Sequence, residues 1–168
     1  MLSLMITMVL LCPNDSIEKL DQFSISNITH GVITEKLKES RDFYVKHLDF
    51  VVVFENEWYV HLQSRNESRF QIAFLLPNHA SQPPIFQPSF GGKGLFYTFE
   101  VANVQVLYER LTKAGVAITF PLTDEPWGER HFALYDPNGV ALNISQATTT
   151  IKEEYQEGFK LETPNINQ

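Results

Sequence analysis

The side chains with the most chemical potential in this sequence lie in two short stretches, 58–61 and 127–131. Each stretch begins with a tryptophan that could stack on a planar ligand, although large aromatic residues beside turns also commonly form core edges. Each also contains a histidine, His61 or His131, and a histidine side chain can act as an acid or a base. Neither histidine has an evident partner nearby in the sequence, which favours a surface or packing role.

Arg130 lies in the second stretch and could clamp a carboxylate or phosphate through two parallel hydrogen bonds. The alternative is a salt bridge to Asp124, Glu125 or Glu129, and both interpretations stay open. The glycine-rich run 91–94 is not a phosphate-binding loop, because it lacks the Lys-Ser/Thr pair and the following helix. No serine-centred nucleophile motif is visible either, so no catalytic residue is assigned.

A predicted hairpin positions the second stretch. Arg130–Tyr135 and Val140–Ser145 both have the composition of strands. Between them, Asp136-Pro137-Asn138-Gly139 supplies an acceptor side chain, a fixed φ, and two residues that tolerate a left-handed backbone.

The remaining elements form two similar halves. Helical spacing predicts one helix at Lys36–His47 and a second over Val104–Ala114, the second capped by Asn103 and ended by Gly115. The other predicted strands are Ser24–Ile33, Phe50–Phe54, Trp58–Gln63, Phe70–Leu76, Leu95–Val101 and Val116–Phe120. Phe50, Val52 and Phe54 align with Val116, Ile118 and Phe120 at a constant offset, which indicates an internal duplication of a βαβββ unit.

Two motifs resemble the vicinal oxygen chelate superfamily of glyoxalases, bleomycin-resistance proteins and extradiol dioxygenases. Trp127, Gly128, Arg130 and Phe132, followed by the Asp-Pro-Asn-Gly turn, are similar to its last hairpin. Leu48-Asp49-Phe50 is similar to its Leu-Gly-Phe helix exit, with Asp in place of Gly at a position where Asp tolerates a left-handed backbone better than most residues. The resemblance covers about 24–146. It implies an α+β fold in which two βαβββ modules form a curled mixed sheet around a cavity, in a homodimer.

The resemblance also sets the expected domain boundaries. Residues 1–22 are an N-terminal extension, and 23–148 are the superfamily domain. Within it, 23–76 is the first module, 77–93 the connection and 94–148 the second module. Residues 149–168 are a C-terminal tail.

In the superfamily, metal ligands lie on the first and fourth strands of each half, commonly as His, Glu/Gln, His and Glu. Matched to this chain, those positions hold Thr29, Gln71, Phe96 and Asn143. This set contains no imidazole or carboxylate, so we expect neither a metal nor another cofactor. His30 is one residue from the first position, but a shift of one residue points a side chain to the opposite face of the sheet.

Alternation along the strands predicts what else faces the cavity. Thr98 and Glu100 share a face with Phe96, and Ala141 and Ser145 share a face with Asn143. The predicted lining mixes polar and apolar groups, which is typical of a small-molecule pocket. The predicted ligand-binding residues are Thr29, Gln71, Phe96, Thr98, Asn143, Trp58, Trp127 and Arg130.

Composition and charge argue against nucleic acid and membranes as partners. A formal net charge of −7 over 168 residues, with no cluster of basic residues, argues against a nucleic-acid partner. The apolar run 1–12 is too short to span a membrane. The single cysteine, Cys12, excludes an internal disulfide and fits a cytoplasmic protein.

The sequence therefore predicts a metal-independent small-molecule-binding protein that sequesters an antibiotic or a toxic metabolite. Two alternatives remain open. One is a metal-dependent, glyoxalase-like lyase, isomerase or dioxygenase; the other is a dimeric scaffold with a vestigial pocket. The identity of the ligand is beyond the sequence.

Overall fold

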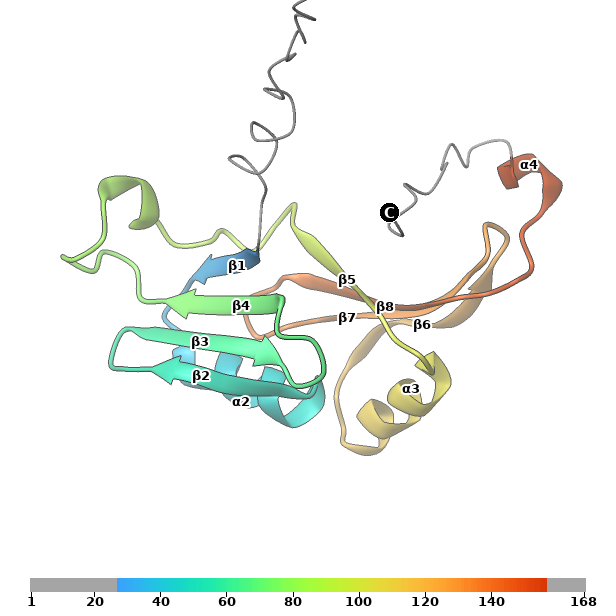
Figure 1. Ribbon diagram of the computed structural model, residues 1–168, viewed down its shortest axis with the longest axis horizontal. Helices are drawn as coiled ribbons and strands as arrows, with labels where there is room; N and C mark the ends of the chain where they lie inside the picture. The colour runs from blue at the N-terminus through green and yellow to red at the C-terminus, as the bar shows by residue number, and fades with distance from the viewer. Residues whose placement is uncertain (1–26, 157–168) are drawn as a thin grey trace, which may run out of the picture.

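The computed structural model describes residues 27–156, which fold into two βαβββ modules (Figure 1). The first module comprises β1 (Ile28–Ile33), α2 (Leu37–His47), β2 (Phe50–Glu55), β3 (Tyr59–Ser64) and β4 (Phe70–Leu75). Its sheet has the order β1-β4-β3-β2, in which β1 is parallel to β4 and the other neighbours are antiparallel. The expected extension 1–22 and the beginning of the expected strand Ser24–Ile33 lie outside the described residues.

The second module repeats this arrangement. It comprises β5 (Phe96–Glu100), α3 (Val104–Lys113), β6 (Ile118–Glu125), β7 (Glu129–Tyr135) and β8 (Ala141–Ala147). The sheet order is β5-β8-β7-β6, again with the first strand parallel to the last. A short 3-10 helix, η1 (Pro84–Phe86), lies in the connection, and α4 (Glu153–Gln156) follows β8. The predicted α+β fold is confirmed, with the two sheets remaining separate. Among the described residues, no helix is long and apolar enough to cross a membrane.

The internal duplication extends to irregularities of the backbone. The register between β2 and β3 shifts between Val52 and Phe54. The register between β6 and β7 shifts between Ile118 and Phe120. Because these are the positions that align in the sequence, the two modules share a bulge as well as a strand order.

Strand β6 is longer than the sequence predicts. The expected strand ends at Phe120, because Pro121 follows, whereas β6 continues to Glu125. It lies at the edge of its sheet, where the N–H that proline lacks is not needed by a neighbouring strand. The extension brings Glu125 opposite Glu129 at the start of β7.

The predicted helix ends are confirmed. Asp49 follows α2 with φ of 58°, so it adopts the left-handed backbone expected at the helix exit. The side chain of Asn103 caps α3 by accepting a hydrogen bond from the backbone N–H of Val106 at 3.1 Å. Gly115 ends that helix with φ of 75°.

One hydrophobic core spans both modules. Helix α2 packs against β2, β3 and β4, and α3 packs against β6, β7 and β8. The core joins inward residues of the first sheet, such as Leu62 and Ile72, to their counterparts Phe132 and Ile144 in the second. Each sheet therefore buries one face against its helix. The residues that alternate with these core positions lie on the opposite face.

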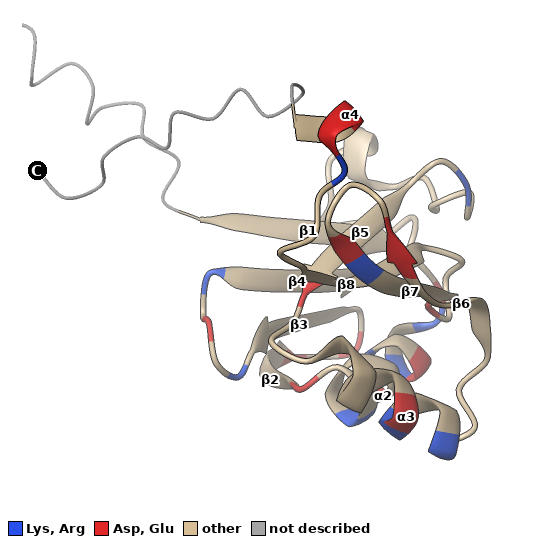
Figure 2. Cartoon of the chain, turned by 90° about the vertical axis from the view of Figure 1, so that its right-hand side faces the viewer, with Lys and Arg blue, Asp and Glu red and all other residues tan. Residues whose placement is uncertain are grey.

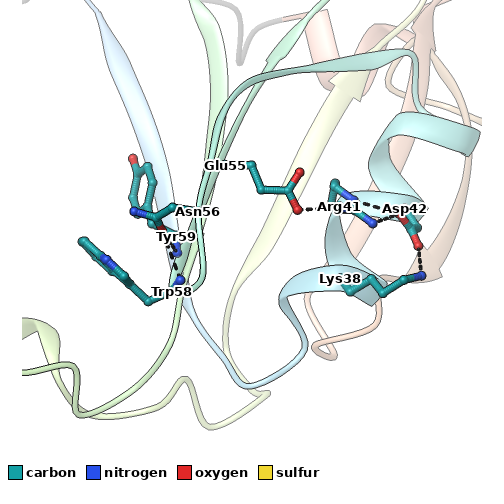
Figure 3. Close-up of polar contacts among 7 residues, drawn as sticks. All are labelled: Lys38, Arg41, Asp42, Glu55, Asn56, Trp58 and Tyr59. Carbon is teal, nitrogen blue, oxygen red and sulfur yellow. Dashed lines mark hydrogen bonds and ion pairs between the residues drawn. The ribbon is translucent and has the colours of Figure 1, made fainter.

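Local polar contacts fix the β2–β3 hairpin of the first module (Figure 3). The side-chain oxygen of Asn56 accepts hydrogen bonds from the backbone N–H groups of Trp58 (3.0 Å) and Tyr59 (2.9 Å). Arg41 on α2 forms an ion pair with Glu55 at the end of β2. These contacts set where β3 begins, and β3 carries a histidine of the site described next.

Candidate functional site

Three polar side chains meet on the helix-free face of the first sheet. Thr29 on β1 lies directly opposite Gln71 on β4, and its hydroxyl donates a 2.9 Å hydrogen bond to Gln71 Oε1. The same oxygen lies 2.9 Å from Nε2 of His61 on β3. The expected positions Thr29 and Gln71 are thus in contact, and a histidine completes the group.

The second sheet carries the same trio. Thr98 on β5 lies opposite Asn143 on β8, and Asn143 Nδ2 donates to the threonine hydroxyl at 3.4 Å. Asn143 Oδ1 lies 2.6 Å from Nδ1 of His131 on β7. Each module therefore holds a threonine on its first strand, a histidine on its third and an amide on its fourth.

The three residues of each trio occupy equivalent positions in the strand pairing of their sheets. In each, the threonine faces the amide across the parallel pair. The histidine lies on the same face one diagonal step away, because His61 pairs with Ala73 and His131 pairs with Ser145. We name these groups the first trio (Thr29, His61, Gln71) and the second trio (Thr98, His131, Asn143).

Two carboxylates lie beside the second trio, and within residues 27–156 no carboxylate is hydrogen-bonded to the first. Glu125 Oε1 lies 3.1 Å from His131 Nε2. Glu129 accepts hydrogen bonds from Asn143 Nδ2 at 3.0 Å and from the indole N–H of Trp127 at 2.9 Å. Figure 2 shows acidic and basic positions side by side in this part of the second sheet.

These contacts determine the protonation of His131. Asn143 Nδ2 donates to Glu129, so Asn143 Oδ1 must accept from His131 Nδ1–H. Glu125 accepts from Nε2–H. Burial alone would lower the pKa of His131, but its hydrogen bonds to Asn143 and Glu125 and the nearby negative charges raise the pKa above the usual 6.5. Burial likewise opposes ionisation of Glu129, yet hydrogen bonds from Trp127 and Asn143 lower its pKa. These contacts favour the imidazolium form of His131, with Glu125 hydrogen-bonded to it and Glu129 nearby.

Exposed aromatic rings accompany both trios on the same faces. Phe54 pairs with His61 across the β2–β3 ladder and is 51% exposed. Phe96 shares the face of Thr98 and is 67% exposed. The ring of Phe120 lies 5.2 Å from that of His131. Polar groups with defined hydrogen-bond geometry therefore lie beside accessible apolar surface, as in small-molecule sites.

The other predicted residues fall in different surroundings. Phe96 lies opposite Ala141, so it does not share a ladder pair with Asn143. Trp58 stacks on His79 at 4.3 Å between ring centroids, and one face of its indole is therefore occupied. Trp127 makes edge contacts with the rings of His131 and Tyr155.

Arg130 points away from the trio. Its guanidinium donates to the side chain of Gln105 on α3 at 3.0 Å and lies 3.5 Å from Asp124. Of the two interpretations left open by the sequence, these contacts favour the structural one.

Sequence reasoning gave the two histidines no partner, and the structure supplies one for each. Counting outward from the Asp136–Gly139 turn pairs His131 with Ser145, so register alone could have placed it beside Asn143. No such signal exists for His61, because the five residues between β3 and β4 do not fix the register. His30 lies one residue from Thr29, opposite the core residue Ile72, with its ring 5.0 Å from that of Tyr97.

Two shallow clefts of the described chain lie outside the trios. One, of about 520 Å³, lies between the β6–β7 hairpin and the segment after β8, and it reaches the second trio only through Glu125. The other, of about 350 Å³, lies at the start of α2 and is lined by residues such as Lys36, Phe90 and Asn138. Neither cleft lies over the helix-free faces of the sheets.

Comparison with known proteins places this architecture. The family model described as Glyoxalase/Bleomycin resistance protein/Dioxygenase superfamily matches residues 20–144. The chain belongs to this superfamily. None of the curated proteins matches the sequence significantly.

Solved structures of the superfamily show the same fold at low sequence identity. A glyoxalase/bleomycin resistance protein/dioxygenase from Nocardioides has a TM-score of 0.61 at 16% identity, covering 83% of this chain and 96% of its own. TnmS3, an antibiotic-binding protein from Streptomyces sp. CB03234, has a TM-score of 0.54 at 20% identity, with coverages of 75% and 99%. Lactoylglutathione lyase from Agrobacterium tumefaciens has a TM-score of 0.57 at 18% identity, with coverages of 73% and 94%.

The residues at the superfamily's metal positions do not fit a first-row metal ion. Thr29, Gln71 and Asn143 offer a hydroxyl and neutral amides, which are weak ligands for such ions. Phe96 offers no donor atom, and Thr98, which lies opposite Asn143, adds only another hydroxyl. Both nitrogens of His131 are already hydrogen-bonded. Within residues 27–156, no group of three or more His, Cys, Asp or Glu side chains is arranged to hold a metal.

Proposed function

We propose that this protein binds a small organic molecule without a metal ion and sequesters it, as an antibiotic or a toxic metabolite. The observation that carries the proposal is the duplicated trio. In both modules, a hydrogen-bonded threonine, amide and histidine lie beside exposed aromatic rings, on the face opposite the helix that packs on each sheet. Such a surface can orient polar groups of a ligand and cover its apolar part.

The neutral donors at the metal positions favour binding over metal-dependent catalysis. A lyase, isomerase or dioxygenase of this superfamily would need a Lewis acid, and amide oxygens hold one poorly. The same amides, fixed by their neighbours, are suitable hydrogen-bond partners for a ligand. TnmS3, which shares this fold, is an antibiotic-binding protein.

In this proposal a second copy of the chain completes the site. The sheets of one chain remain separate, and each leaves aromatic side chains such as Phe54 and Phe96 exposed on its trio face. Pairing with another copy would cover those side chains and enclose the ligand. We place the dimer in the cytoplasm, where a chain with one cysteine needs no disulfide.

A thermal-shift screen tests the binding function. A collection of amphipathic and cationic antibiotics should contain at least one compound that raises the melting temperature saturably, because a ligand of the folded state stabilises it. The response should weaken in Gln71→Leu and Asn143→Leu, which keep side-chain volume but remove the amides. It should persist in Gln82→Leu, a change of the same type in the connection. A broad screen without any saturable shift would contradict the proposal.

A further inference from the structure

The first trio leaves one histidine nitrogen unused. Gln71 Nε2 donates a 2.8 Å hydrogen bond to the backbone carbonyl of Ser68. A carbonyl only accepts, so this contact fixes which end of the amide is nitrogen and which is oxygen. The oxygen, Oε1, therefore faces Thr29 and His61.

The orientation of Gln71 in turn sets the tautomer of His61. Oε1 accepts from the Thr29 hydroxyl and lies 2.9 Å from His61 Nε2. An amide oxygen has no proton to give, so Nε2 must carry the hydrogen. In the neutral imidazole, the lone pair then lies on Nδ1.

Nδ1 of His61 is open on the trio face. Within residues 27–156 it has no hydrogen-bond partner. It is also accessible to solvent, because it is not among the fully buried side-chain atoms that lack a partner. The ring of Tyr59 lies 6.3 Å from the His61 ring, and that of Phe54 lies 6.1 Å from Tyr59. The free acceptor is thus flanked by aromatic surface.

The second trio differs at this point. His131 donates from both nitrogens, to Asn143 and to Glu125, and has no lone pair to offer. The duplicated histidines therefore have opposite characters. Both nitrogens of His131 donate hydrogen bonds, whereas His61 keeps one nitrogen, Nδ1, free to accept one.

We propose that His61 Nδ1 is the acceptor for the weakly acidic hydroxyl of a bound phenol-type ligand. The ligand's O–H points at Nδ1, and its ring lies against Phe54 and Tyr59. When the proton transfers, the ligand O–H bond breaks and an Nδ1–H bond forms, which leaves a phenolate beside an imidazolium. Gln71 and Thr29 hold the imidazole in position. This inference rests on the proposed small-molecule function and names the ligand class at the first trio.

Nuclear magnetic resonance of the ¹⁵N-labelled protein tests the orientation without a ligand. His61 should show the Nε2–H tautomer. The preference should be lost in Gln71→Met, which removes the acceptor, and kept in Thr29→Val, which leaves Gln71 in place. His131 supplies an internal reference, with both nitrogens protonated. A predominant Nδ1–H tautomer of His61 in the unaltered protein would overturn the proposal.

Titration with 4-nitrophenol, whose absorbance reports its ionisation, tests the recognition. The full-length protein should bind it saturably and increase the phenolate band. His61→Phe should keep the aromatic contacts but bind about tenfold more weakly and leave the band unchanged, since a hydrogen bond to a charged group is lost. His47→Gln, on the far side of the sheet, should behave like the unaltered protein.

Either of two results in this titration would overturn the inference. One is the absence of 4-nitrophenol binding. The other is a His61→Phe variant that binds 4-nitrophenol as tightly as the unaltered protein does and increases the phenolate band to the same extent. Neither would affect the antibiotic screen, which reports binding of any chemistry. The failure of this inference is therefore distinguishable from the failure of the proposed function.

Discussion

The hydroxyl of Tyr44 donates a 3.1 Å hydrogen bond to Asp136, which joins the helix of the first module to the turn of the second. Both residues are buried. The other carboxylate oxygen of Asp136 accepts from the backbone N–H groups of Asn138 and Val140. One carboxylate therefore shapes the turn between β7 and β8 and holds it against α2. Burial and the charge of Asp136 raise the pKa of Tyr44 well above its usual value, so the hydroxyl remains a donor.

Tyr44→Phe should lower the free energy of unfolding by about 2 kcal/mol, because a hydrogen bond to a buried charged group is lost while the ring is kept. Urea unfolding measures the change. Tyr135→Phe removes the same hydroxyl from a side chain that is 56% exposed and should alter stability by less than about 0.5 kcal/mol. Equal effects of the two substitutions would show that the Tyr44–Asp136 contact does not join the modules.

The Asp136–Gly139 turn also shows how far the sequence could predict this fold. Turn chemistry, helix caps and the duplication were readable because each depends on residues close in the sequence or on a constant offset. The contact of Asp136 with Tyr44 was not readable, because 92 positions separate the two residues.

The same limit applied to the site. Alternation placed Thr29, Gln71, Thr98 and Asn143 on common faces. Their histidine partners depended on sheet register across loops, which composition does not encode. The residues directly after β8 contact the β6–β7 turn, and the sequence did not predict these contacts. The backbone N–H of Thr148 donates to the carbonyl of Gly128, and that of Lys152 donates to Pro126.

Gly128→Ala should destabilise the protein by about 1–3 kcal/mol. Gly128 has φ of 89°, and a Cβ at this position would lie 2.5 Å from Cγ1 of Ile151. Ile151→Ala should recover the part of the loss that comes from the clash and leave the part that comes from the backbone, so a double-mutant cycle separates them.

Gly91→Ala is the matched control for this pair, because an added Cβ there has no neighbour within 4 Å. Thermal and urea unfolding of the four variants should show no loss in Gly91→Ala. If Gly128→Ala were equally harmless, that result would contradict the close packing of Ile151 against Gly128 in the β6–β7 turn.

Metal content should be well below one ion per chain in protein purified without chelators. Added Zn, Ni, Mn or Fe(II) should leave the melting temperature unchanged, because an ion that does not bind the folded state does not stabilise it. Elemental analysis and melting scans provide the measurements. A stoichiometric metal that raises the melting temperature would contradict the assignment of Thr29, Gln71, Phe96 and Asn143 as non-ligands, and a metal-dependent activity would become the leading interpretation.

The environment of His131 predicts a loss of stability with rising pH. Its pKa is raised in the folded protein from the usual 6.5, so the folded state holds a proton that the unfolded state has released. The stabilisation is complete below about pH 6.5 and is lost as the pH rises through the folded pKa. The slope from one group is at most about 1.4 kcal/mol per pH unit. Urea unfolding between about pH 6 and about pH 9 measures it.

His131→Gln should flatten this dependence, since glutamine keeps a donor toward Glu125 but does not titrate. The pKa shift of His47 has the opposite sign, because burial and the nearby charges of Lys46 and Arg110 lower its pKa. Its contribution is complete above about pH 6.5 and is lost as the pH falls through its folded pKa. His47→Gln should therefore leave the decline above pH 6.5 intact, whereas an unchanged decline in His131→Gln would mean that His131 is not the imidazolium between Glu125 and Glu129.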